Sequence, residues 1–282
     1  MHRGLSGGEA SVFAPDSVSR LVHADPAMWI AGVRSLYLQA LHPVAARGVM
    51  QNSRFRQDPT GRLLRTARFV ATVTYGTRAQ AERAASRVRR IHAALSVFDP
   101  DTGEQSPLDR PDLLLWIHCA SVASYLEVVR RAGLSISDAM ADRYVDEQRL
   151  AAELVGLPAA DVPKSVGELA EYIAGARPDL RHSEESAQIY DFLSCPPPPA
   201  WFSRRTQPIA PMAQAAYRGT AAIVWGSLSR LAYSALPPWA VSLYRHRSYP
   251  VAVTTCALRS MRRAALTVPA VVRVAAVRPP AR

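Results

Sequence analysis

Apolar side chains recur at helical spacing along most of the chain. After Asp25 and Pro26, which suit a helix start, they lie three or four positions apart at Ile30, Val33 and Tyr37. Pro43 predicts an interruption after this first helix. Further helices are predicted at 59–76, 77–95 and 113–132. The segment 113–132 is apolar on nearly every side, so we expect it to be the buried central helix.

The second half of the chain continues this pattern. Serines in capping positions precede further helical segments, at 135 or 137, at 165 and at 183, and two more helices are predicted at 212–236 and 250–266. Prolines 196–199 are expected to form a rigid connector. Because no segment shows sustained two-residue alternation, the predicted fold class is all-α, a single globular multi-helix domain. We expect an N-terminal arm at 1–24, the helical domain at 25–250, and a basic amphipathic helix and tail at 251–282.

Composition and charge narrow the class of protein. The chain has 282 residues, 49% of them hydrophobic, and 34 Lys and Arg against 23 Asp and Glu, for a net charge of +11. Lys164 is the single lysine, and the arginines are spread along the chain beside abundant alanine, as GC-rich coding produces. No nucleic-acid partner is therefore expected. An arginine-rich C-terminal helix leaves peripheral membrane contact as an alternative.

The cysteines and the first residues point to a cytoplasmic protein. Cys119, Cys195 and Cys256 cannot all pair within one chain and lie far apart, so we expect them to be reduced. Their surroundings also lack the motif of thiolate-ligated haem monooxygenases. The opening residues contain no apolar core of the kind that a signal peptide needs.

Common catalytic signatures are absent from the sequence, which directs attention to its histidines. There is no phosphate-binding glycine loop, no G-x-S-x-G, no H-E-x-x-H, and no E-x-x-H pair of the kind used by di-iron carboxylate proteins. Three histidines, however, lie within predicted helices on or beside apolar stripes: His42, His92 and His118. Each could be a core histidine bonded to a carbonyl, and His42, just before Pro43, is expected to be a helix-end residue of that kind.

His92 and a second helix together suggest a flat, anionic cofactor. Small side chains accompany His92 on its stripe, which leaves room for a planar group. Arg62, Arg65 and Thr66 share one face of the preceding helix because they follow an i, i+3, i+4 pattern. Guanidinium groups and a hydroxyl opposite an imidazole suit haem, with histidine on the iron and arginine on the propionates or on bound dioxygen.

Two sequence strings carry a family resemblance. GRLLRTARFVATVTYGT followed by AERAASRVRRIHAALS resembles the haem-dependent oxygenases that include the bacterial latex-clearing rubber oxygenases and the fungal oxygenase of mycophenolic acid biosynthesis. The segments LYLQALHPVAARGV and DLLLWIHCASV resemble short actinobacterial members, once described as a domain of unknown function. In that family an Arg-x-x-x-Thr helix precedes a segment whose histidine is the proximal ligand of b-type haem. The resemblance implies that Arg62 and Thr66 match the first motif and His92 the second.

The chain departs from the rubber oxygenases at two positions. Arg65 replaces the lysine found before the threonine, and Ser96 replaces an arginine that follows the proximal histidine there. An arginine does not readily lose its proton or coordinate iron, so rubber-type distal chemistry is in doubt. His118 has no matching ligand role in those enzymes. It could be a distal residue, a second axial ligand or a core histidine.

The resemblance implies a haem b-dependent oxygenase that acts on a small lipophilic substrate. His92 would ligate the iron within a haem pocket in 25–250, Arg62 and Arg65 would hold propionates or polarise bound oxygen, and Thr66 would bond a distal ligand or water. The apolar lining would come from Trp116, Val122 and Tyr125, which are equally suited to the core.

Two alternatives remain open from the sequence. One is a non-catalytic haem carrier or sensor with both axial positions of the iron filled. The other is a peripheral membrane protein without cofactor, favoured by the arginines that alternate with apolar residues near the C-terminus: Arg259, Arg262, Arg263, Arg273 and Arg278.

Overall fold

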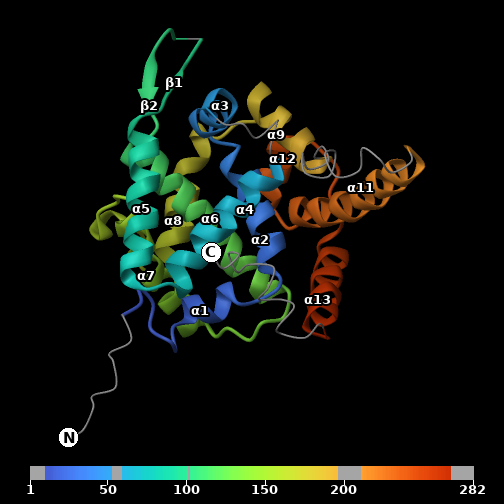
Figure 1. Ribbon diagram of the computed structural model, residues 1–282, viewed down its shortest axis with the longest axis horizontal. Coiled ribbons are helices and arrows are strands. Elements are labelled where there is room, and N and C mark those ends of the chain that lie inside the picture. Colours follow the sequence, from blue (N-terminus) through green and yellow to red (C-terminus); the bar gives the residue numbers. More distant parts are fainter. Residues whose placement is uncertain (1–9, 53–58, 101, 196–210, 268–282) are drawn as a thin grey trace, which may run out of the picture.

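Helix α6, Pro111–Arg131, runs through the centre of the protein. It belongs to a computed structural model that describes residues 10–52, 59–100, 102–195 and 211–267 (Figure 1). Trp116, Cys119, Ala120 and Val128 on this helix are almost completely buried, which confirms the predicted central helix. Gly133 follows it with a φ of 95°, and the Leu134 amide donates to the Val129 carbonyl, so the last turn ends in a glycine C-cap.

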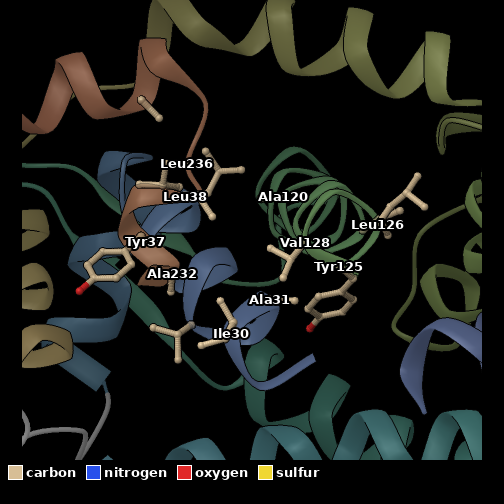
Figure 2. Packing of buried hydrophobic residues seen from close by; sticks show 14 of the residues in the cluster. Ile30, Ala31, Tyr37, Leu38, Ala120, Tyr125, Leu126, Val128, Ala232 and Leu236 are labelled. Atoms are coloured by element: carbon tan, nitrogen blue, oxygen red, sulfur yellow. The ribbon is translucent and has the colours of Figure 1, made fainter. Parts of the chain in front are cut away.

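Helix α2, Met28–Gln39, packs along α6 and provides the largest helix–helix interface of the core. Figure 2 shows Ile30, Ala31 and Leu38 of α2 packed in one cluster with residues of α6 and of the helix that follows residue 210. The buried Arg34 side chain lies within this interface. Its Nε donates to the carbonyl oxygen of Ala235 at 2.9 Å and its Nη1 to Oγ of Ser124 at 2.6 Å. The guanidinium therefore joins three helices by hydrogen bonds.

The start of the chain is more structured than its sequence pattern indicates. Helix α1, Val18–His23, lies within the segment described above as an arm. Both oxygens of the Glu147 carboxylate accept hydrogen bonds from the α1 amides of Val18 and Ser19, at 3.2 and 2.7 Å. A carboxylate at a helix N-terminus satisfies unpaired amides and interacts favourably with the helix dipole. Ser17 adds a local cap, because its side-chain oxygen accepts a hydrogen bond from the Arg20 amide at 3.3 Å. This short helix is therefore capped both by a neighbouring residue and by a partner distant in sequence.

Helices α4, Pro59–Tyr75, and α5, Arg78–Ala93, form an antiparallel hairpin. Thr77 caps α5 as predicted, and it forms a full capping box with Gln80. Gly76 occupies the turn. A Cβ at this position would lie 2.5 Å from the Thr72 carbonyl oxygen, so the tight reversal between the two helices requires glycine.

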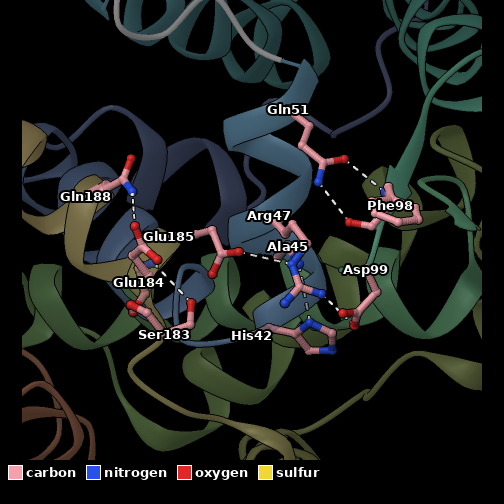
Figure 3. A network of polar contacts seen from close by, with 11 residues as sticks. His42, Ala45, Arg47, Gln51, Phe98, Asp99, Ser183, Glu184, Glu185 and Gln188 are labelled. Atoms are coloured by element: carbon pink, nitrogen blue, oxygen red, sulfur yellow. Dashed lines mark hydrogen bonds and ion pairs between the residues drawn. The ribbon is translucent and has the colours of Figure 1, made fainter. Parts of the chain in front are cut away.

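A small β-hairpin lies between the predicted helices at 77–95 and 113–132, where the sequence predicted no strand. Strands β1, Ser96–Phe98, and β2, Gln105–Pro107, pair antiparallel and project from one end of the molecule in Figure 1. Helix α3, Pro43–Asn52, supports this hairpin, since the Gln51 amide group both donates to and accepts from the backbone of Phe98. Arg47 of α3 adds an ion pair to Asp99 at 2.5 Å and another to Glu185 at 3.0 Å (Figure 3).

The remaining helices cover α2 and α6 on the other sides. Ser137, Ser165 and Ser183 each cap the helix that follows, as the sequence predicted. In a capping box the Glu168 side chain would accept a hydrogen bond from the Ser165 amide, but here it accepts one from the amide of Lys164. The predicted all-α class is confirmed, with the β-hairpin as a minor addition. These elements are α7, Asp138–Leu154; α8, Val166–Ala176; α9, Glu184–Ser194; α11, Pro211–Ser234; α12, Pro238–Tyr244; α13, Val251–Thr267; and the short 3₁₀ helices η2, Ala159–Asp161, and η3, Arg177–Asp179.

Replacing Arg47 should destabilise the fold measurably. Its side chain is only 7% exposed, so Arg47→Met leaves the Asp99 and Glu185 carboxylates without their shared cation. Because both carboxylates are partly solvated, we expect a loss of about 2 kcal/mol in the free energy of unfolding, measured by urea denaturation. Arg83→Met, at an exposed position of α5, is the matched control and should stay within about 0.5 kcal/mol of the unsubstituted protein. Equal effects of the two substitutions would refute the stabilising role of the Arg47 ion pairs.

Candidate functional site

The α4–α5 hairpin brings Arg62 close to His92. The two helices are antiparallel, and Arg62 lies about as far before the turn as His92 lies after it. Their proximity also appears in the electrostatics, because the Arg62 charge contributes to lowering the pKa of His92. The predicted arginine helix and the predicted histidine helix therefore meet at the end of the hairpin remote from Gly76.

The three predicted residues on α4 differ in their surroundings. Arg62 is partly buried, and its pKa is lowered first by burial and then by the neighbouring charge of Arg65. Arg65 and Thr66 are exposed, and Oγ1 of Thr66 donates to the carbonyl oxygen of Arg62 at 3.2 Å. The helix thus presents a partly desolvated positive charge, which favours an anionic group beside it.

His92 lies in the last turn of α5 with a partly exposed ring. Burial is the main cause that lowers its pKa, while the Asp109 carboxylate acts in the opposite direction. Asp109 stands just before α6, after the β-hairpin, so the hairpin returns the chain to His92. Within the described ranges, no hydrogen bond is formed by the His92 ring.

His118 occupies the third turn of α6 and is not joined to the α4–α5 residues. Burial lowers the pKa of its imidazole to about 4, so the ring is neutral at neutral pH. In the part of the chain that the structure describes, neither ring nitrogen of His118 has a hydrogen-bond partner. By contrast His23, whose pKa is also lowered to about 4 by burial, bonds Thr74 at 2.7 Å and Tyr144 at 3.2 Å. The His118 side chain is partly exposed, whereas both ring nitrogens of His23 are bonded within the protein.

His42 caps a helix rather than bonding a carbonyl. It directly precedes α3, and its Nδ1 accepts a hydrogen bond from the Ala45 amide at 3.4 Å (Figure 3). The prediction that His42 is a helix-end residue agrees with this position, but the bonded group is an amide. The His42 ring also lies 6.3 Å from that of Trp116, centroid to centroid.

The residues expected to line an apolar pocket are part of the core. Trp116 is 1% exposed and its indole donates to the Gln39 carbonyl, while Val122 and Tyr125 belong to the same buried cluster. Two cavities occur elsewhere. One, of about 440 Å³, is lined by an exposed face of α13, and the other, of about 210 Å³, by residues of α2, α9 and α11. Neither is lined by Arg62, His92 or His118.

The structure also shows the state of the three cysteines and the surroundings of the α13 arginines. Cys119, Cys195 and Cys256 are free thiols, as predicted. Arg262 is occupied by an ion pair with Asp25 at 2.6 Å, whereas Arg259 and Arg263 are exposed. Arg273, Arg278 and the prolines at 196–199 lie outside the described residues. Helix α6 is long and apolar enough to cross a membrane by length and composition, yet half of its most apolar window is buried in the fold.

Comparison with protein families decides the relationship. Residues 20–269 match the family described as ER-bound oxygenase mpaB/B'/Rubber oxygenase, catalytic domain. The chain belongs to this family. No curated protein and no solved structure matches the chain. The catalytic domain of this oxygenase family thus covers every helix described above except the first two residues of α1.

The oxygenase contains one candidate residue that the sequence did not reveal. Asp109 acts on His92 only because the β-hairpin folds back, and the hairpin itself was not predicted. The available signal was the position of Asp109 two residues before Pro111, at the start of a helix, where polar side chains are common.

The residues present fit a haem group. Arg62 supplies a partly desolvated charge for a carboxylate, and both His92 and His118 hold imidazoles without a hydrogen-bond partner in the described segments. No group of three or more His, Cys, Asp or Glu side chains among the described residues could hold a bare metal ion. Haem iron requires only one or two protein ligands, so this arrangement suits haem better than a mononuclear metal site.

The buried His118 should make the oxygenase sensitive to acid. Its pKa is about 4 in the fold against an ordinary 6.5, so between these values the unfolded chain binds the proton and the folded chain does not. Stability is therefore full above pH 6.5 and falls as the pH drops towards 4, by about 3 kcal/mol from this group. His118→Leu should flatten the dependence of the unfolding free energy on pH by that amount in this window.

A non-titrating change on the same helix serves as the control. Ser121→Ala removes the hydroxyl that bonds Gln39 and should shift the stability curve without changing its slope. If His118→Leu leaves the slope between pH 4 and 6.5 unaltered, the imidazole is not held neutral by the fold.

Proposed function

We propose that this protein is a haem b-dependent oxygenase that acts on a small hydrophobic substrate. The observation that supports the proposal most directly is the proximity of His92 and the partly desolvated Arg62, in a chain that belongs to an oxygenase family. An imidazole and a guanidinium on adjacent helices suit haem, because the first can ligate iron and the second can pair with a propionate.

His92 is proposed as the proximal ligand. Asp109 is the carboxylate whose charge acts on this ring, and we propose that it accepts a hydrogen bond from the other ring nitrogen. Such a partner fixes the tautomer and the orientation of a ligating histidine. Asp109 would thus be a positioning residue.

Arg62 and Arg65 would hold the propionates, and Thr66 would face the distal side. Because Thr66 donates its own proton to the Arg62 carbonyl, its oxygen can accept a hydrogen bond from water or from a protonated ligand. When bound, haem would supply a redox-active iron for reaction with dioxygen. Leu63 and Leu64 are partly exposed apolar side chains on the same helix and suit a hydrophobic substrate.

Hydrogen exchange in the α4 amides should slow when haem is added, because Arg62, Arg65 and Thr66 all lie on this helix.

A second function is favoured by His118. Its imidazole is neutral and has no hydrogen-bond partner among the described residues, which is the state needed in an iron ligand. If both histidines ligate iron, the protein is a haem carrier or sensor. Carbon monoxide distinguishes the functions, because it binds readily to reduced haem only where one axial position is open.

Haem retention should depend on His92. With haem available during expression, the purified protein should show a Soret band at one haem per chain, and His92→Ala should abolish it because the proximal nitrogen is lost. His118→Ala should retain haem. His182→Ala, remote from α4 and α5 and bonded to Ser186, is the matched control. Absence of a Soret band in the unsubstituted protein would overturn the proposal, and loss of haem in both His92→Ala and His118→Ala would support the carrier.

Arg62 and Thr66 should affect different properties of the haem-loaded protein. Arg62→Ala should speed haem dissociation about tenfold or more, because a propionate loses its charged partner. Thr66→Ala should retain haem, lower turnover about a hundredfold and shift the carbon monoxide stretching frequency. Arg68→Ala, on an exposed position of the same helix, should change none of these. Small, equal effects of Arg62→Ala and Thr66→Ala on stability alone would contradict their placement at the cofactor.

A further inference from the structure

A cavity of about 210 Å³ lies between three helices and is partly open to solvent. It is lined by Tyr37 of α2, Tyr190 and Ser194 of α9, and Gly226, Arg230 and Tyr233 of α11. None of these residues belongs to α4, α5 or α6. Tyrosine hydroxyls, a serine and one arginine make its lining partly polar, so the cavity can take a ligand that has both a ring and a polar group.

Aromatic contacts hold the walls of this cavity in place. The Tyr37 and Tyr233 rings meet at a centroid distance of 5.6 Å and an angle of 71°, and Tyr190 and Tyr233 at 5.2 Å and 84°. The outer face of Tyr190 is stacked on His246 at 4.0 Å. These edge-to-face and stacked arrangements are favourable in themselves, so the cavity need not collapse when it is empty.

Polar groups also face the space. Tyr37 bonds Ser229 at 2.7 Å and Ser194 at 3.2 Å, and Tyr233 donates to the His246 carbonyl, so two of the three phenols are fixed. The Tyr190 hydroxyl has no hydrogen-bond partner within the described ranges. It therefore remains available as a donor to a ligand.

The single cation of the cavity is Arg230. Its guanidinium lies 5.3 Å from the centre of the Tyr249 ring and forms no ion pair with a carboxylate of the described residues. The charge of Asp191 acts on Tyr37, but Asp191 does not line the cavity. An exposed arginine at the edge of an aromatic cavity favours a planar anion, which it can bind with two parallel hydrogen bonds.

We infer that this cavity binds a small aromatic monocarboxylate. The ring would lie among Tyr37, Tyr190 and Tyr233, and the carboxylate would meet Arg230 and the Tyr190 hydroxyl. A cavity of about 150 Å³ accommodates benzene, so 210 Å³ has room for one ring with a polar substituent but not for a large polycyclic compound. This site is independent of the proposed oxygenase function.

Substitution of Gly226 can test whether filling the cavity prevents binding. A Cβ built on this residue would have its nearest contact with the Ser194 carbonyl oxygen at 3.7 Å, an ordinary van der Waals distance. Gly226→Leu therefore adds a side chain beside the cavity without a forced clash at Cβ. Gly226→Ala adds only a methyl group, and alanine is the better helix former, so this variant should fold at least as well as the unsubstituted protein.

Benzoate and its neutral analogue benzamide are the probes. Titration of the full chain, followed by calorimetry and by nuclear Overhauser contacts to tyrosine ring protons, should show saturable benzoate binding. Arg230→Gln should weaken benzoate binding about tenfold while leaving benzamide binding unchanged, because only benzoate carries the charge. Arg83→Gln, which removes an exposed charge on α5, is the control and should alter neither.

The filling variants complete the test. Gly226→Leu should abolish the binding of both probes, and Gly226→Ala should weaken it only slightly, with thermal melting to verify that both variants are folded. Benzoate binding that survives Arg230→Gln and Gly226→Leu unchanged, or no saturable binding at all, would overturn the inference. His92→Ala should leave benzoate binding intact. The result of the benzoate titration can therefore be distinguished from a failure of the haem proposal.

Discussion

The fold depends on covering the apolar side chains of α6. Much of the circumference of this 21-residue helix is apolar, and burying those side chains against neighbouring helices is favourable, while Glu127 on the same helix is exposed. Helix α2 forms the largest of these contacts with α6, and many of its own side chains are buried too. The positions of α1, α7, α8, α11 and α13 follow from the same requirement, because each contacts one of these two helices or their immediate neighbours.

Burial on this scale restricts what polar groups can do. Arg34 is tolerated inside the α2–α6 interface because two of its nitrogens donate hydrogen bonds, to Ala235 and to Ser124. Burial still lowers the pKa of this guanidinium to about 10. His23 is satisfied in the same way by hydroxyl groups of Thr74 and Tyr144. His118 on α6 differs from these two examples, because its ring has no hydrogen-bond partner among the described residues and its side chain is partly exposed.

Local signals in the sequence predicted most helices but not the contacts between distant segments. Thr77, Ser137 and Ser183 were recognisable as caps because a side-chain cap and the amide it bonds lie within three residues. Asp25 was expected to begin the first helix; its carboxylate does bond the Ala27 amide, but regular α2 starts at Met28. Helix α1 was not predicted, although Ser17 caps it locally, because only six residues follow the cap. The bonds from its Val18 and Ser19 amides to Glu147, 128 residues away from Ser19, are not visible in the sequence.

The candidate site likewise has features that the sequence predicts and one that depends on the tertiary structure. The shared face of Arg62, Arg65 and Thr66 is a property of one helix, and the approach of His92 follows from a tight helical hairpin closed by Gly76. The charge of Asp109 acts on His92 across a β-hairpin whose backbone is bonded by Gln51 of another helix. Sequence periodicity contains no information about such a contact, since it depends on the tertiary position of three separate elements.

The ion pair between Asp25 and Arg262 has a consequence for how the chain is made. Asp25 is 7% exposed, and its other carboxylate oxygen bonds the Ala27 amide at the entrance to α2. Its guanidinium partner is synthesised 237 residues later. During translation, the Asp25 carboxylate therefore lacks its cation until α13 has left the ribosome, so the native contacts at the entrance to α2 form only after residues 251–267 have been synthesised.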